Sequence, residues 1–154
     1  MPTQDKGIDL IAYDDAGRAV LAAEVKSRVG TSEAWAARFR RNIMAHGTVP
    51  QAMFFLIATP DRMYFWKQNG MQAEDARPEL TVDAATEFQR YFEKLDRPTQ
   101  PLSENALELL VALWLGEIAT AGNADARRDP SMRWLWESGL IGSLDKARIE
   151  TNPA

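Results

Sequence analysis

The sequence lacks cysteine and has a single histidine, His46, among its 154 residues. Without cysteine there are no disulfide bonds, thiolate nucleophiles or Cys-ligated zinc sites, as is typical of proteins in the reducing cytoplasm. One histidine excludes metal sites built from several histidines and leaves a single possible base for a Ser-His-Asp triad. We therefore expect any chemistry to rest mainly on carboxylates, amines and hydroxyls.

Long apolar segments are also absent. The longest apolar run, LLVALWL at 109–115, is far shorter than the ~20 residues that a membrane-spanning helix needs. No positively charged segment followed by an apolar one opens the chain, so no targeting peptide is indicated. We expect a cytoplasmic protein without membrane contact, whose 45% hydrophobic residues suffice for one core.

Positive charge is not in excess, because the net charge is -4. The charges are nevertheless unevenly distributed along the chain. Residues 1–73 hold nine Lys and Arg against seven Asp and Glu, whereas residues 74–154 hold nine against fifteen. Because basic side chains neutralise the phosphate backbone, any nucleic-acid contact is expected on the N-terminal half.

The apolar patterning predicts an α/β fold. Two pairs of short apolar runs, each separated by turn residues, indicate two hairpins. The predicted strands are 8–13, 19–26, 53–59 and 63–67. Capping residues followed by apolar positions three or four apart indicate helices. The predicted helices are 31–47, 81–95, 103–122 and 131–139. Prolines 98 and 101 separate a core at 1–97 from a helical C-terminal element at 98–154 that packs on it.

Charged residues in the first hairpin are the main candidates for chemistry. A two-residue loop at Ala16-Gly17 would place Asp9 opposite Glu24, with Lys26 on the same face. Two carboxylates at that spacing repel each other unless a cation lies between them, and hard oxygen ligands suit Mg²⁺ or Mn²⁺. A three-residue loop ending at Gly17 would instead turn Glu24 to the other face, unless a bulge compensates.

The order of these features resembles the PD-(D/E)XK nuclease superfamily. Asp9 on a strand, a hairpin, the segment Glu24-Val25-Lys26, a helix with arginines and an apolar strand follow one another over about residues 7–67. The resemblance implies a restriction-endonuclease-like mixed sheet with flanking helices, and a Mg²⁺-dependent endonuclease that hydrolyses phosphodiester bonds in DNA. It implies that Asp9, Glu24 and the Val25 carbonyl bind the metal, Mg²⁺ or Mn²⁺, and that Lys26 lies next to the attacking water.

Two further segments, FLIATPDRMYFWK and WLWESGL, resemble parts of bacterial proteins in which such a core precedes a helical tail. The sequence departs from the family pattern in two ways. Ile8 replaces the family's proline. The family core opens with a helix and a strand, whereas only eight residues precede Asp9 here, and this second departure matters for assembly. We expect a homodimer that covers the exposed sheet, with the C-terminal tryptophans as its contact surface. The alternative is that the C-terminal helices cover the sheet within one chain.

Basic and aromatic residues suggest contacts with DNA. Arg28, Arg38 and Arg41 are candidates for a rim that binds phosphates beside the site. Arg40 lies away from Arg38 and Arg41 on the helix, and we expect it on a solvated face. Tyr64, Phe65 and Trp66 are expected to pack in the core. The competing functions are a nuclease-like module that binds nucleic acid or a partner without cutting, and an interaction protein that acts through its Trp-rich tail.

Overall fold

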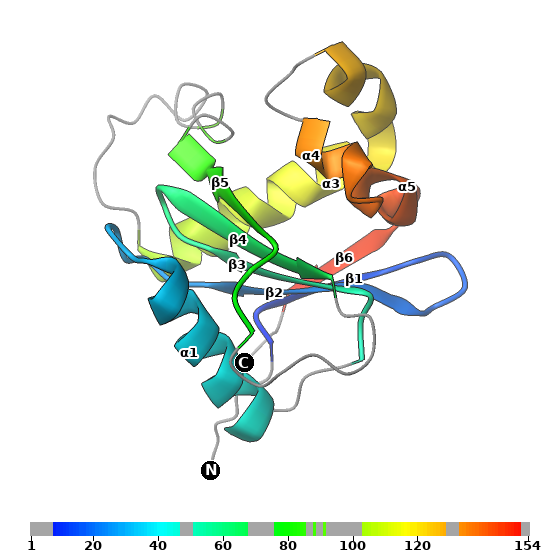
Figure 1. The fold of residues 1–154 in the computed structure, drawn as a ribbon. Coiled ribbons are helices and arrows are strands. Elements are labelled where there is room, and N and C mark those ends of the chain that lie inside the picture. Colours follow the sequence, from blue (N-terminus) through cyan, green and yellow to red (C-terminus); the bar gives the residue numbers. More distant parts are fainter. Residues whose placement is uncertain are drawn as a thin grey trace.

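The computed structural model describes residues 8–46, 51–67, 76–85, 88, 91, 103–128 and 133–151. They form an α/β structure in which helices flank both faces of a six-stranded mixed sheet (Figure 1). The strands are β1 (Leu10–Tyr13), β2 (Ala19–Val25), β3 (Phe54–Ala58), β4 (Arg62–Lys67), β5 (Leu80–Asp83) and β6 (Arg148–Thr151). The helices are α1 (Glu33–His46), α3 (Glu104–Arg128), α4 (Arg133–Glu137) and α5 (Leu140–Leu144). The strand order is β5-β4-β3-β2-β1-β6.

The loop of the first hairpin has three residues, so the expected two-residue loop is wrong. The Asp14 N–H donates to the Arg18 carbonyl (2.9 Å), and Gly17 has the left-handed φ of 84° that favours glycine. Asp14 Oδ1 accepts from the N–H groups of Ala16 and Arg18, which holds the turn. This loop alone would shift the register by one residue.

A β-bulge restores the register. Tyr13 pairs with Ala19, but Ala12 pairs with Leu21, so Val20 is an extra residue in β2. Consequently Val20 and Leu21 both pack into the same core cluster. Beyond the bulge Leu10 lies opposite Ala23, which brings Asp9 opposite Glu24 as the sequence predicted.

Strand β3, at the centre of the sheet, is apolar throughout. β2 and β3 are parallel neighbours joined through α1, while β3 and β4 form an antiparallel pair. Every residue of β3 is buried, as are Tyr64, Phe65 and Trp66 of β4, whose exposed fractions are 0%. Strands buried on both faces are expected to be continuously hydrophobic. The prediction that these aromatic residues pack in the core is therefore confirmed.

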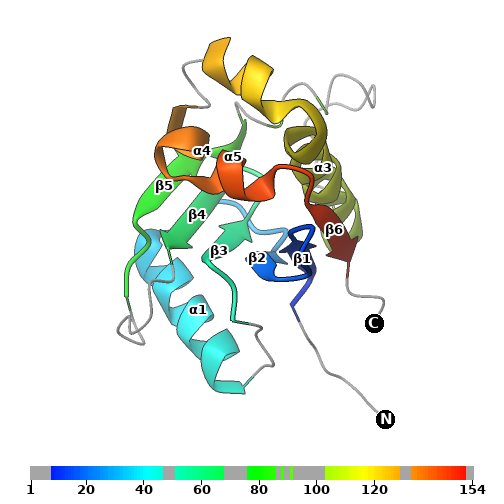
Figure 2. The ribbon, with the colours of Figure 1, turned by 90° about the vertical axis from the view of Figure 1, so that its right-hand side faces the viewer.

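Each face of the sheet has its own helical layer (Figures 1 and 2). α1 covers one face, where Ala36 packs with Phe55, Ile57, Tyr64 and Trp66. The segment from α3 to α5 covers the other face and supplies Leu107, Val111, Trp114, Leu135, Leu140 and Leu144 to the larger core cluster. The sheet is thus enclosed between α1 and the C-terminal helices.

The C-terminal segment is not purely helical as predicted. Its residues 148–151 form β6, which pairs antiparallel with β1. The helix expected at 81–95 also begins later, because residues 80–83 form strand β5. Of the remainder of that helix the structure describes four residues, Ala84, Ala85, Phe88 and Tyr91, and these are helical. Both unpredicted strands are edge strands of four residues with largely exposed side chains.

Trp114 belongs to the core rather than to an exposed surface. Its exposed fraction is 0%, its ring stacks on Trp134 at 6.3 Å between centroids, and its edge meets Phe88 at 5.9 Å. The side chain of Trp136 lies outside the described residues. The C-terminal helices therefore cover the sheet within one chain, and Trp114 is not the dimer contact that the sequence suggested.

Among the described residues, no helix combines the length and apolarity needed to cross a membrane.

Replacing Trp114 by alanine tests this packing. We expect Trp114→Ala to lower the free energy of unfolding by about 3–5 kcal/mol, because it removes a fully buried indole from the core. Leu109→Ala on the same helix is the control: Leu109 is 62% exposed, and its replacement should change stability by less than about 0.5 kcal/mol. Urea denaturation measures both, and equal effects of the two variants would contradict the assignment of Trp114 to the core.

Candidate functional site

The carboxyl groups of Asp9 and Glu24 each accept a backbone hydrogen bond across the end of the first hairpin. The Asp9 N–H donates to Glu24 Oε1 (2.8 Å), and the Val25 N–H donates to Asp9 Oδ2 (2.9 Å). These bonds continue the pairing of β1 and β2 past Leu10 with side-chain acceptors. Both residues are partly buried. The two carboxyl groups are therefore held side by side in a fixed orientation, as the sequence predicted.

The pKa of Glu24 is shifted by its position in this arrangement. Burial raises the pKa of Glu24 to about 8, the negative charge of Asp9 adds to the effect, and Lys26 opposes it only weakly. At neutral pH the Glu24 carboxyl therefore retains a proton that an ordinary glutamate has lost.

Lys26 lies directly after β2, at the junction of three elements. Its N–H donates to the Ala58 carbonyl of β3 (3.0 Å), which fixes its backbone. Its Nζ lies 5.4 Å from the centroid of the Phe39 ring on α1 and 3.9 Å from Glu104 Oε2 on α3. The side chain is 39% exposed, so solvent or a ligand reaches the amine. The charge of Lys26 also acts on Glu24, whose pKa it lowers slightly against the larger effect of burial.

Helix α3 adds acidic residues that the sequence analysis missed. Glu104 and Glu108 are one turn apart on α3, and Glu104 forms the ion pair with Lys26. Partial burial raises the pKa of Glu108, with further contributions from the charges of Asp9 and Glu104. The ion pair with Lys26 places the first turn of α3 near the end of β2, and both lie toward the left of Figure 1. The sequence shows that Glu104 and Glu108 are four residues apart. Their proximity to Lys26 and Asp9 results from the docking of α3, which the sequence does not show.

The donor set at the site suits a hard divalent cation. Asp9 and Glu24 provide carboxylate oxygens, and the Val25 peptide lies against Asp9 because its N–H donates to that carboxylate. The two carboxyl groups held side by side are the observation that favours this fit, and a cation would offset both the burial of Glu24 and the charge of Asp9, which together raise the pKa of Glu24. Within the described residues, no group of three or more His, Cys, Asp or Glu side chains is placed to hold a metal ion. A third protein ligand would have to be a backbone oxygen such as that of Val25.

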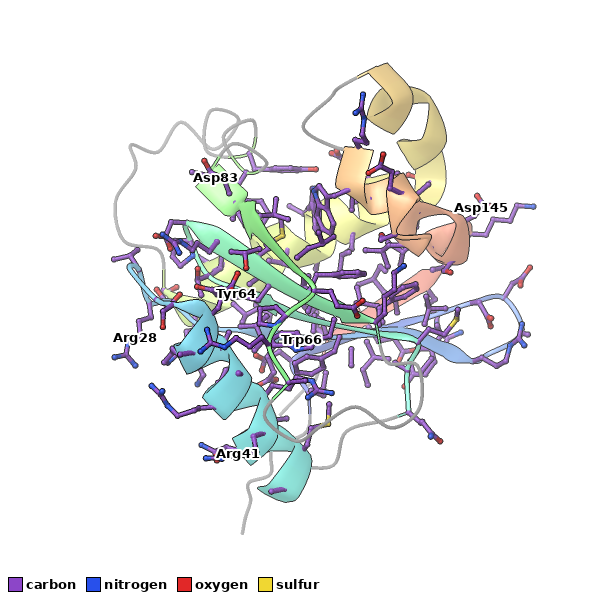
Figure 3. All side chains as sticks on the ribbon, viewed as in Figure 1. Arg28, Arg41, Tyr64, Trp66, Asp83 and Asp145 are labelled. Atoms are coloured by element: carbon purple, nitrogen blue, oxygen red, sulfur yellow. The ribbon has the colours of Figure 1, made fainter. Side chains whose placement is uncertain are left out.

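The arginines predicted to contact phosphates are more exposed than Arg40, for which no such contact was predicted. Arg28, Arg38 and Arg41 are exposed, and Figure 3 shows Arg28 and Arg41 projecting outward on the α1 side of the molecule. Arg40 is only 5% exposed and its guanidinium lies 5.5 Å from the centroid of the Trp66 ring. The expected solvated position of Arg40 is therefore wrong, because this side chain packs between α1 and the sheet.

Comparisons with known protein families, with curated protein sequences and with solved structures find no significant match to this chain.

The pKa of Glu24 predicts an unusual dependence of stability on pH. The folded state keeps its proton up to about pH 8, whereas an unfolded glutamate loses it near its ordinary pKa of about 4.3. The folded state therefore binds more protons between these values, and this group makes the free energy of unfolding fall as pH rises through that range. Glu24→Gln preserves the acceptor for the Asp9 N–H but cannot ionise.

We expect Glu24→Gln and the wild type to have equal free energies of unfolding below about pH 4. At pH 8 to 9 the variant should be more stable by roughly a few kcal/mol, because the difference follows from the size of the shift in the pKa of Glu24. Urea denaturation in EDTA across this range measures the difference. Parallel curves for the two proteins at all pH values would show that Glu24 ionises normally.

Proposed function

We propose that this protein is a Mg²⁺-dependent endonuclease that hydrolyses phosphodiester bonds in DNA, with Mn²⁺ as a second possible cation. The observation that carries the proposal is the pair Asp9–Glu24, held together at the end of a hairpin with Lys26 beside it. The resemblance of this segment to PD-(D/E)XK nucleases supports the same reaction. Because a nucleophile such as cysteine is absent, direct attack by water is the simplest route.

The residues divide into two roles. Asp9 and Glu24 would hold the cation through their carboxylate oxygens, together with the carbonyl of Val25. When bound, the cation would offset the negative charge that develops on the phosphate and make a water easier to ionise. Lys26 carries an ammonium that donates hydrogen bonds to a water or to a phosphate oxygen. Its Nζ also lies 3.9 Å from Glu104 Oε2 and 5.4 Å from the centroid of the Phe39 ring.

The charge of the site implies an order of binding. Asp9, Glu24, Glu104 and Glu108 are acidic, and among the described residues Lys26 is the cation in direct contact with this group. A phosphodiester is negative and would be repelled by such a cluster. A cation must therefore bind first, and its binding must displace the proton from Glu24, so affinity should rise with pH.

A second candidate function has its own supporting observation. Both carboxylates already accept backbone hydrogen bonds, so they could serve only to close the hairpin in a nuclease-like module that binds nucleic acid without cutting it. The cost of holding Glu24 protonated argues against this, because glutamine would form the same bonds without it. Function commonly retains groups that reduce stability.

Cation binding and cleavage test the proposal together. We expect Mg²⁺ or Mn²⁺ to raise the melting temperature of the wild type, because a ligand of the native state stabilises it, and to support cleavage of DNA. Asp9→Asn and Glu24→Gln should lose both effects. Lys26→Met should lose at least 100-fold in cleavage rate while still binding the cation, since a positioned donor is worth about 10²–10³ in rate.

Asp15→Asn is the matched control, because Asp15 is an exposed carboxylate at the tip of the same hairpin. It should leave cleavage and cation binding unchanged. A wild type that binds neither cation and cuts no form of DNA would contradict the endonuclease. Binding of DNA without cleavage at any cation concentration would favour the non-cutting module.

A further inference from the structure

Two aromatic side chains of α1 flanked by two basic ones form a row that leads to the site. Trp35 and Phe39 lie one turn apart and stack, with ring centroids 5.3 Å apart and planes at 25°. The Arg28 guanidinium lies 6.0 Å from the centroid of the Trp35 ring. Lys26 Nζ lies 5.4 Å from the centroid of Phe39. Four side chains, Arg28, Trp35, Phe39 and Lys26, thus form one row, which we call the aromatic row, and it ends at the proposed catalytic lysine.

Packing alone does not account for this row. Trp35 contacts Tyr64 at 6.2 Å between centroids, so its inner side belongs to the cluster on the α1 face of the sheet. A purely structural pair lies on another side of α1, where Arg40, the residue after Phe39, covers Trp66 and both are almost fully buried. In the aromatic row, by contrast, Trp35 and Phe39 are partly exposed and Arg28 is exposed.

The row has the composition that unpaired nucleotides bind. Bases stack on aromatic rings and on guanidinium planes, while basic side chains hold the backbone. Arg38 follows Trp35 by one helical turn and is exposed, as is Arg41 one turn later. This concentration of positive charge contrasts with a chain whose net charge is -4. A base within a duplex offers no free face for stacking.

We propose that the aromatic row binds single-stranded DNA, with an unpaired base displacing the exposed Arg28 guanidinium from the Trp35 ring and with the neighbouring phosphates on Arg28 and Arg38. This inference names the substrate class of the proposed endonuclease and rests on that function. Its binding step, however, requires no cation and no cleavage. The row then delivers an unpaired strand to Lys26, so single-stranded or flapped DNA is cut in preference to an intact duplex.

Binding in EDTA tests the aromatic row separately from catalysis. The probes are a fluorescein-labelled oligothymidylate and a labelled duplex of equal length, followed by fluorescence anisotropy at several salt concentrations. We expect the wild type to bind the single strand more tightly. Trp35→Leu should weaken single-strand binding by about 5- to 100-fold, because stacking is worth about 1–3 kcal/mol per base, and should leave duplex binding unchanged.

Two further variants separate stacking from charge and from folding. Trp35→Phe retains an aromatic face and should restore most of the single-strand affinity. Arg28→Gln should weaken the binding and reduce the salt dependence by about one phosphate contact. Arg133→Gln is the matched control, since Arg133 is exposed on α4 in the opposite helical layer, and should have no effect. Thermal melting confirms that each variant is folded.

The outcomes distinguish this inference from the proposed function. Equal or tighter binding of the duplex, no binding of the oligothymidylate, or equal losses for both probes in Trp35→Leu would overturn the single-strand site. Cleavage of duplex DNA with no preference for single strands would overturn it while leaving the endonuclease intact. Tight, Trp35-dependent binding of single strands without cleavage would support it and contradict the endonuclease.

Discussion

One extra residue in β2 determines the candidate site. The three-residue loop at the tip of the first hairpin would place Glu24 on the opposite face from Asp9, and Val20, the bulged residue, reverses that shift. The bulge is also anchored, because Val20 is buried in the core formed with the C-terminal helices. The geometry of the carboxylate pair therefore depends on packing at the other end of the hairpin, on the opposite face of the sheet.

The candidate site contacts the helical layers on both faces of the sheet. Lys26 contacts Phe39 of α1 and Glu104 of α3, which belong to the helices on opposite faces of the sheet. Such a meeting point lies at the end of the strands, where both faces are accessible. There Glu104 and Glu108 of α3 add negative charge near Lys26 and Asp9.

Local patterns in the sequence were sufficient for the parts of the structure with strong periodicity. The four central strands and α1 follow from apolar runs and capping residues, and the opposition of Asp9 and Glu24 was predicted correctly, although through the wrong loop. The edge strands were missed because Leu80–Asp83 and Arg148–Thr151 are short, polar segments whose strand conformation comes from pairing with β4 and β1. Glu104 and Glu108 were missed for a related reason: their proximity to Asp9 results from the docking of α3, which no local pattern encodes.

Arg40 illustrates the same limit within a helix. Its position on the helical wheel separates it from Arg38 and Arg41, which correctly distinguishes it from the exposed pair. Whether Arg40 faces solvent or the sheet depends on which residues of the sheet lie beneath its side of the helix. Here the guanidinium of Arg40 packs over the ring of Trp66. The sequence therefore identified the difference among the arginines but assigned the wrong environment to Arg40.

The pairing of β6 with β1 has a consequence for how the molecule forms. These neighbours in the sheet are separated by most of the chain, since Leu10 lies opposite Thr151. Contacts between such distant segments raise the contact order and are formed late, after the intervening loop has been closed. A nascent chain emerging from the ribosome would display β1 with one open edge until residues 148–151 had been synthesised. During that interval the open edge of β1 is available to other strands, which favours aggregation and chaperone binding.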